Sequence, residues 1–138
     1  MWSESKFMNK LKEIKTHKAP KSVSSYSQAV VAGNFIFCSG QIGLNPKTNI
    51  LVKGGTEKET KQVLRNLGNV LKAADLDFKD VVRVDVFLTN MNDFTKVNEI
   101  YANFFKSDPK PARQTVGVSK LPKEASIEIS CIAYKGEK

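Results

Sequence analysis

The 138-residue sequence has few residues that bind metals, with one histidine and two cysteines. Cys38 and Cys131 lie far apart in apolar runs, so we expect buried free thiols rather than a disulfide. No HExxH or CxxC pattern occurs, and no metal site is therefore expected. GxGxxG and GxxxxGK motifs are absent too, so nothing supports a nucleotide cofactor.

Long hydrophobic runs are also missing. No stretch approaches the roughly 18 apolar residues of a membrane span, and no secretory signal pattern precedes the first predicted strand. The lysine-rich first 21 residues contain Glu4 and Glu13 and no arginine, which disfavours an organelle transit peptide. We expect a soluble cytoplasmic protein, with organellar targeting as the alternative.

The charge is strongly positive, with 22 basic and 14 acidic residues and a formal net charge of +8. Clustered cations bind polyanions by releasing counterions, so nucleic acid is a candidate partner. However, only three of the basic residues are arginines, the lysines are scattered, and no aromatic-interleaved platform for stacking bases is visible. We interpret the lysines as solubilising and keep nucleic-acid binding as the alternative.

Apolar periodicity predicts the order of helices and strands in one domain. Apolar runs on both sides of Gly33-Asn34 predict a hairpin, and Thr56 followed by Glu59 is a capping-box pattern that predicts a helix to about Ala74. Apolar residues recur at every second position over residues 82–89, which predicts a strand. An apolar stripe over residues 94–105 predicts a second helix that begins after Asn92 or Asp93, and we interpret its aromatic residues as core.

Two further strands, at 112–118 and 127–134, complete an α+β fold in which two helices cover one face of a single mixed β-sheet. The alternation places Arg113 and Glu128 on the other face, beside Phe87, Ile132 and Tyr134. That face is too apolar for open water, and its charges are costly to bury unpaired. We therefore expect a homo-oligomer that leaves a polar pocket at the seam between subunits.

Arg113 and Glu128 suggest a reaction. If their strands are antiparallel neighbours, the two residues lie about 13 Å apart at opposite sheet ends, so one chain cannot bring them together. An arginine binds a carboxylate through two parallel hydrogen bonds, and a glutamate can orient water and move a proton. The pair suits hydrolysis at a carbon next to a carboxylate; two unrelated surface charges are the alternative. We expect His17 to face solvent.

Five segments carry a family resemblance. They are "SSYSQAV" (24–30), "CSGQIGLNPKT" (38–48), "VFLTNMNDFTKVNEIYANFF" (86–105), "KPARQTVGV" (110–118) and "LPKEASIEISCIA" (121–133). In this order they resemble the Rid family of YjgF-like reactive intermediate deaminases, most closely its RidA branch. The resemblance divides the chain into an N-terminal extension, residues 1–12, and one Rid-like domain, residues 13–138.

The resemblance implies a fold like that of the small trimeric chorismate mutases and a homotrimer with pockets between subunits. It also implies hydrolysis of 2-imino acids, such as 2-iminopropanoate and 2-iminobutanoate, to 2-keto acids and ammonia without a cofactor. The rival functions are an RNA-binding or RNA-cleaving translation inhibitor and a non-catalytic, chaperone-like trimer that binds a ligand.

The family's functional residues transfer to matching positions. Arg113 takes the place of the carboxylate-binding arginine and Glu128 that of the water-directing glutamate. The substrate-binding positions are Tyr26, Ser39, Gly40, Asn98 and Thr115, the last often a cysteine in the family. We expect Arg113 and Asn98 from one subunit and Tyr26, Ser39 and Glu128 from its neighbour.

Each pocket position has a simpler interpretation: Tyr26 as a packed aromatic, Ser39-Gly40 as a turn, and Asn98 as a surface amide of a helix. The chain also departs from the family pattern at Ser24-Ser25, Gln114 and Ser130. These departures leave the preferred substrate size open.

Overall fold

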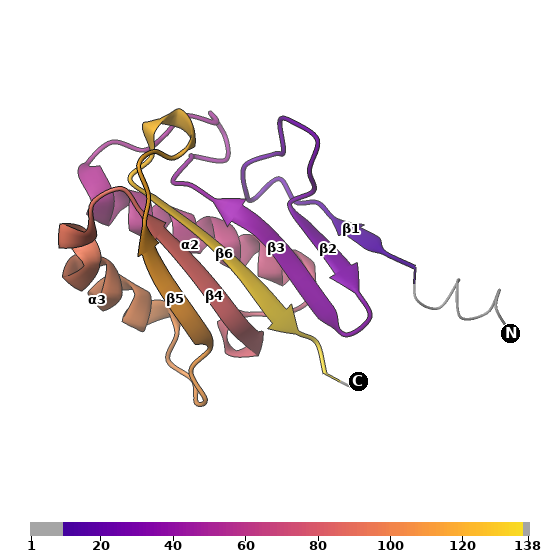
Figure 1. Ribbon diagram of the computed structural model, residues 1–138. Coiled ribbons are helices and arrows are strands. Elements are labelled where there is room, and N and C mark those ends of the chain that lie inside the picture. Colours follow the sequence, from indigo (N-terminus) through magenta and orange to yellow (C-terminus); the bar gives the residue numbers. More distant parts are fainter. Residues whose placement is uncertain (1–9, 137–138) are drawn as a thin grey trace, which may run out of the picture.

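Two helices cover one face of a six-stranded sheet in the computed structural model, which describes residues 10–136 (Figure 1). The strands are β1 (Lys12–Ile14), β2 (Ala29–Ala32), β3 (Phe35–Gln41), β4 (Val81–Leu88), β5 (Ala112–Gly117) and β6 (Ile127–Tyr134). The helices are α2 (Gly55–Ala73) and α3 (Phe94–Phe104), and short 3₁₀ turns occupy Phe78–Asp80, Met91–Asp93 and Pro122–Glu124. The predicted α+β fold is confirmed; of the predicted extension, residues 1–9 lie outside the described residues.

The sheet has the strand order β1-β2-β3-β6-β4-β5. β4 and β5 run parallel, and all other neighbouring pairs are antiparallel. β4 therefore lies between β5 and β6, so the strands of Arg113 and Glu128 are not the antiparallel neighbours on which the estimated distance depended. The predicted hairpin is confirmed: Gly33 and Asn34 join β2 to β3, with Gly33 at the positive φ of 59° that a tight hairpin turn requires.

The first helix starts differently from the prediction. Gly54, with φ 117°, is the N-cap residue, and no side chain caps the helix. Thr56 instead donates its hydroxyl hydrogen to Asp93 Oδ2 at 2.9 Å, and the buried Glu59 carboxylate accepts from the backbone N–H of Ser126 at 2.8 Å. The predicted capping box is therefore wrong, because both side chains tie α2 to other segments.

The core lies between the sheet and the helices. Five side chains on one stripe of α2 are fully buried there, Val63, Leu64, Leu67, Val70 and Leu71. Cys38 and Cys131 are directly paired across β3 and β6, and both are buried free thiols, as predicted. A hydrogen bond with Cys38, together with burial, holds the pKa of Cys131 well above its usual value.

The second helix, α3, begins where the sequence predicted. Asp93 is its N-cap residue but makes no side-chain cap; the preceding turn is capped instead by Asn90, whose side chain accepts from the N–H of Asn92. The side of α3 that faces the core includes the buried residues Val97 and Tyr101. Neither helix within the described residues is both long and apolar enough to cross a bilayer.

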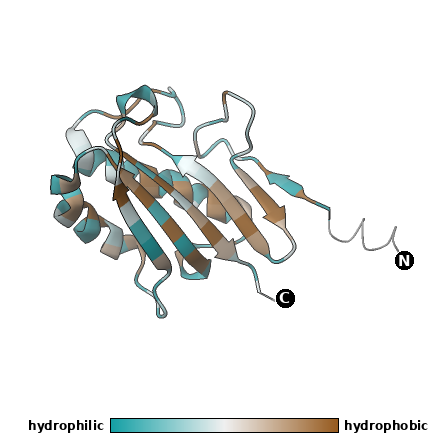
Figure 2. Ribbon diagram, viewed as in Figure 1, coloured by the Kyte–Doolittle hydropathy of each residue, from teal (hydrophilic) through white to brown (hydrophobic). Residues whose placement is uncertain are grey.

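The other sheet face has no helix over it within residues 10–136 and is partly apolar, as predicted. Phe35, Phe37 and Tyr134 are 41%, 47% and 41% exposed, and hydrophobic residues dominate β2, β3 and β6 (Figure 2). The placement of Arg113 on this face is wrong. Arg113 is paired with Val84, whose side chain is fully buried beneath the helices, and paired residues of neighbouring strands point to the same side. The Arg113 side chain therefore lies on the helix side.

Candidate active site

Arg113 is held by one face of α3. Its Nη1 donates a hydrogen bond to Asn98 Oδ1 at 2.7 Å. Its guanidinium carbon lies 4.7 Å from the ring centroid of Tyr101 and 5.7 Å from that of Phe94. Phe94, Asn98 and Tyr101 are spaced so that their side chains share one side of the helix. An edge-strand arginine is therefore bound by an amide and two aromatic rings.

The Arg113 guanidinium keeps hydrogen-bond donors for an external anion. The side chain is exposed, and it forms no ion pair with any carboxylate among residues 10–136. Of its five N–H donors, one is used by Asn98, which leaves enough for a bidentate contact. A cavity of about 430 Å³ adjoins it, lined in part by Asn98, Tyr101 and Arg113. This region can bind a carboxylate.

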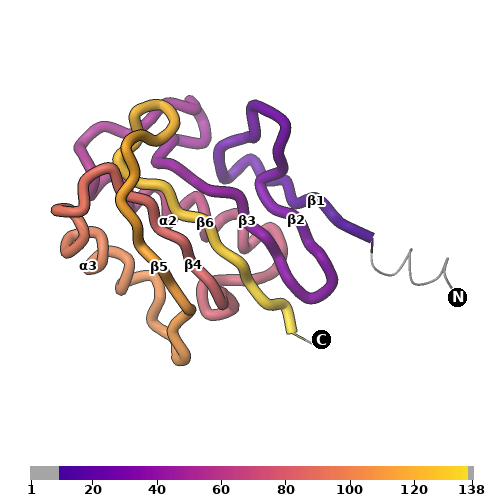
Figure 3. The backbone as a smooth tube through the Cα atoms, viewed as in Figure 1, coloured from indigo at the N-terminus to yellow at the C-terminus, as the bar shows by residue number. Residues whose placement is uncertain are grey.

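Glu128 lies in a second cavity, of about 420 Å³, with Tyr26, Ser39 and Gly40 among its lining residues. The loops that surround this cavity, residues 15–28, 42–54 and 118–126, gather at one end of the sheet (Figure 3). Ser39 joins two of the lining segments, because its hydroxyl donates to the carbonyl oxygen of Ser27 at 2.6 Å and its N–H donates to that of Gln28 at 3.0 Å. The cavity thus combines an acid with polar and apolar walls.

The Glu128 carboxylate is half-buried beside Gly40. Burial raises the pKa of Glu128 above its usual value, because removal from water disfavours the charged form. A Cβ atom at Gly40 would overlap the Glu128 carboxylate, so only glycine leaves space for it. A carboxyl group with a raised pKa suits a base that takes a proton from water and later returns it.

Gly40→Ala should therefore displace the Glu128 carboxylate. Because the added methyl group overlaps a functional group rather than the core, we expect a loss of activity of tenfold or more with little loss of stability. Activity measurements and a thermal melt of the variant would measure the two effects. Gly33→Ala is the control for glycine substitution, since nothing lies near its Cβ position, although its positive φ will cost some stability. Wild-type activity in Gly40→Ala would contradict this account.

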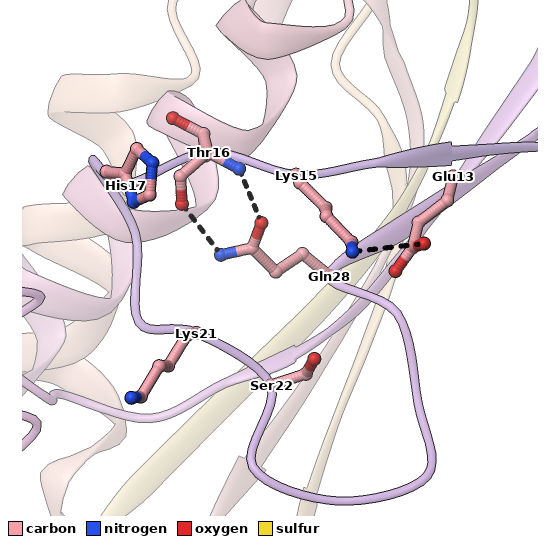
Figure 4. Close-up of a pocket in the computed structure, with 7 residues that line it drawn as sticks. All are labelled: Glu13, Lys15, Thr16, His17, Lys21, Ser22 and Gln28. Atoms are coloured by element: carbon pink, nitrogen blue, oxygen red, sulfur yellow. Dashed lines mark hydrogen bonds and ion pairs between the residues drawn. The ribbon is translucent and has the colours of Figure 1, made fainter.

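A buried amide that the sequence analysis missed supports the loop that carries Tyr26. Gln28 accepts from the N–H of Thr16 at 2.8 Å and donates to the carbonyl oxygen of Thr16 at 3.1 Å (Figure 4). It also donates to the carbonyl oxygen of Pro20 at 2.8 Å. It fastens the segment after β1 to β2. A glutamine at the start of an apolar run was the available signal. His17, beside this segment, is exposed as predicted.

One chain does not bring the two cavities together. In the strand register, Arg113 is level with Val84 and Cys131, three residues beyond Glu128 on β6. The Cα atoms of Arg113 and Glu128 are separated by two strand spacings across the sheet and by three residues along a strand, which together amount to about 14 Å. Their side chains also point to opposite faces. The separation is close to the predicted one, but it spans two strand spacings rather than one, and the predicted shared face is wrong.

The predicted site residues therefore form two groups. Asn98 is beside Arg113, whereas Tyr26, Ser39 and Gly40 are beside Glu128. Thr115 lies two residues beyond Arg113 on the same strand face but lines neither cavity. Phe94 and Tyr101, interpreted from their spacing as core, contact Arg113. Their spacing relative to Asn98 was the signal that could have identified them.

Comparisons with known proteins match nearly the whole domain. A family model described as Endoribonuclease L-PSP matches residues 16–135. A RutC family protein of Pyrococcus horikoshii is 52% identical over 122 residues, 88% of this chain and 96% of the relative. The human 2-iminobutanoate/2-iminopropanoate deaminase is 49% identical over 123 residues, 89% of either chain.

Solved structures share the fold. Escherichia coli TdcF with bound serine has a TM-score of 0.85 at 35% identity, covering 91% of this chain and 99% of its own. RidA from the Antarctic bacterium Psychrobacter sp. has a TM-score of 0.85 at 41% identity, covering 89% of this chain and 98% of its own. Every residue of both groups, from Tyr26 to Glu128, lies inside the matched region.

Proposed function

The chain belongs to the Endoribonuclease L-PSP family, that is, the Rid or YjgF-like family, and we propose that it is a deaminase that hydrolyses 2-imino acids to 2-keto acids and ammonia. The observation that carries the proposal is the pair of groups available for such a substrate: a fixed guanidinium with free donors and a half-buried carboxyl with a raised pKa. Relatives named as 2-iminobutanoate/2-iminopropanoate deaminases in human, rat and mouse support it. So does TdcF, whose bound serine is a small molecule with a carboxylate.

In the proposed mechanism, Arg113 receives the substrate carboxylate. Glu128 accepts a proton from a water molecule as the water oxygen attacks the C=N carbon, and the C=N π electrons move to nitrogen. The resulting carbinolamine gains a proton on nitrogen and loses one from the hydroxyl group. Ammonia then leaves as the C=O bond forms. The protonated imine is already electrophilic, so Arg113 and Glu128 need only orient it and transfer protons.

We propose that the two cavities combine at the seam between subunits of a homotrimer. Each seam would bring Arg113 and Asn98 of one copy toward Tyr26, Ser39 and Glu128 of the next. Two features support this: the separation of the groups in one chain, and the exposed Phe35, Phe37 and Tyr134 on the open sheet face. A solution mass measured by light scattering tests the assembly, and a monomer that is fully active would contradict it.

The activity test generates the unstable substrate in place. A serine or threonine dehydratase would supply 2-aminoacrylate or its four-carbon homologue, which become imines, and release of ammonia or keto acid would be followed with and without the protein. We expect the protein to accelerate release above the spontaneous rate. Equal rates with and without it, over a range of protein concentrations, would refute the proposed activity.

RNA binding is a second candidate because of one surface. Lys58, Lys61, Arg65 and Lys72 are exposed on α2, and none of the four forms an ion pair within the described residues. Their charges could neutralise phosphates, in which case affinity would fall steeply with salt. RNA affinity that is absent at low salt would remove this candidate and leave the deaminase proposal intact.

A further inference from the structure

The geometry points to Tyr101 as a positioning residue that fixes the orientation of the Arg113 guanidinium for the substrate carboxylate. This inference rests on the proposed deaminase function and assigns a role to a residue that the proposed mechanism does not use. Tyr101 contacts Arg113 and lines the adjoining cavity, and the proposed mechanism gives it no contact with the reacting atoms. Its aromatic ring would therefore act through the arginine.

The Tyr101 ring is held in place by its neighbours, whereas the Arg113 side chain without contacts would be mobile. Tyr101 is 7% exposed, and its ring stacks on that of Phe105 with centroids 4.3 Å apart and planes 20° apart. Phe105 in turn meets the edge of Phe78 at 4.9 Å. An exposed arginine on an edge strand otherwise has considerable rotamer freedom. The aromatic stack therefore gives a mobile cation a fixed surface.

The amide and the ring restrain Arg113 in different directions. Asn98 accepts from Nη1 at 2.7 Å, which fixes one position on the guanidinium edge. Tyr101 lies 4.7 Å from the guanidinium carbon and fixes the remaining orientation by cation–π attraction. Phe94 is a weaker contact at 5.7 Å. With both restraints present, the unused N–H donors of Arg113 already have the orientation that substrate binding requires. The side chain therefore loses less conformational entropy when the substrate binds.

The ring, and not the hydroxyl group, carries this effect. The Tyr101 hydroxyl is buried and makes no hydrogen bond of good geometry among the described residues. Burial raises the pKa of Tyr101, and the charge of Arg113 together with a weak hydrogen-bond contact to its guanidinium opposes this rise. An unpartnered buried hydroxyl group destabilises a fold, so its removal should not weaken this protein. Phenylalanine at this position keeps the aromatic face and removes only the hydroxyl group.

The experiment separates the electrostatics of the ring from its shape. Tyr101→Phe, Tyr101→Leu and a protein with pentafluorophenylalanine at position 101 would be compared with wild type for imine hydrolysis, for binding of pyruvate by calorimetry, and for thermal stability. The fluorinated ring keeps its packing but loses its negative face. We expect it and Tyr101→Leu to raise KM and the pyruvate Kd by about 2- to 30-fold with kcat nearly unchanged. Tyr101→Phe should keep the wild-type KM and should melt no lower than wild type.

The control is Phe104→Leu, which removes a half-buried ring whose aromatic partner is Phe78 rather than Tyr101 or Phe105. It should lower the melting temperature and leave KM and the pyruvate Kd unchanged. The inference is overturned if the fluorinated protein binds pyruvate as wild type does, or if Phe104→Leu weakens binding equally. Should wild type bind pyruvate and yet hydrolyse no imine, the proposed function fails, while the comparison of pyruvate affinities still decides the role of Tyr101.

Discussion

Glu128→Gln should lower kcat for imine hydrolysis by about 10²- to 10⁴-fold, with a much smaller change in KM. Glutamine has nearly the same shape and can still contact water, but it cannot accept the proton that the attacking water loses. The rate constants would be measured with the imine generated in place. Glu124→Gln is the control, since it removes an exposed acid from the turn that precedes β6. A Glu128→Gln protein with wild-type kcat would exclude Glu128 as the base.

The same residue predicts a pH dependence. Burial raises the pKa of Glu128, so kcat/KM should fall as the pH is lowered through that raised value, where the base becomes protonated.

A group with a raised pKa in the folded state stabilises the fold fully below its unfolded pKa, and this contribution is lost as the pH rises through the folded value. Glu128→Gln should therefore melt no lower than wild type at neutral pH, and a lower melting temperature there would contradict a desolvated carboxylate.

Arg113→Ala should lower kcat/KM by roughly 10- to 150-fold, mainly through KM, because a charge-assisted contact to a carboxylate contributes about 1.5 to 3 kcal/mol. Arg113→Lys should recover only part of the loss, since an ammonium group lacks the planar pair of donors. Steady-state kinetics of both variants would measure these effects. Arg65→Ala, which removes an exposed arginine from α2, is the control. Unchanged kcat/KM in Arg113→Ala would refute its role.

Period-two alternation could group the strand residues correctly but could not orient every strand. It correctly placed Arg113 on one face of β5 and Gln114 and Val116 on the other. Which of these two faces lies toward the helices could be determined only from the parallel register of β5 with β4. β5 is an edge strand whose residues are all exposed or half-buried, so its hydropathy carries little information about which side is inside. In β4 and β6, buried residues alternate clearly from Val84 and from Ile127 onward, and the faces predicted there were correct. Val82, predicted to face inward, is exposed because the register shifts between Val81 and Arg83.

Local motifs fail where a side chain finds a distant partner. Thr56 and Glu59 have capping-box spacing, but Glu59 binds the N–H of Ser126, which is 67 positions away in the sequence. No local pattern contains that contact. The contacts of Tyr101 and Phe94 with Arg113 were missed for the same reason. An aromatic residue in an apolar helical stripe has the same sequence pattern whether its ring packs only in the core or also contacts a cation. The sequence could nominate Arg113 and Glu128, but only the sheet order shows how they are separated.

That separation has a genetic consequence. If a working centre takes its arginine from one polypeptide and its glutamate from the next, two defective alleles can complement each other. In rings assembled at random from Arg113→Ala and Glu128→Gln chains, about one junction in four would unite an intact arginine with an intact glutamate. Co-expression of the two should thus recover roughly a quarter of normal turnover from parents that have almost none, whereas centres contained within single chains would recover nothing.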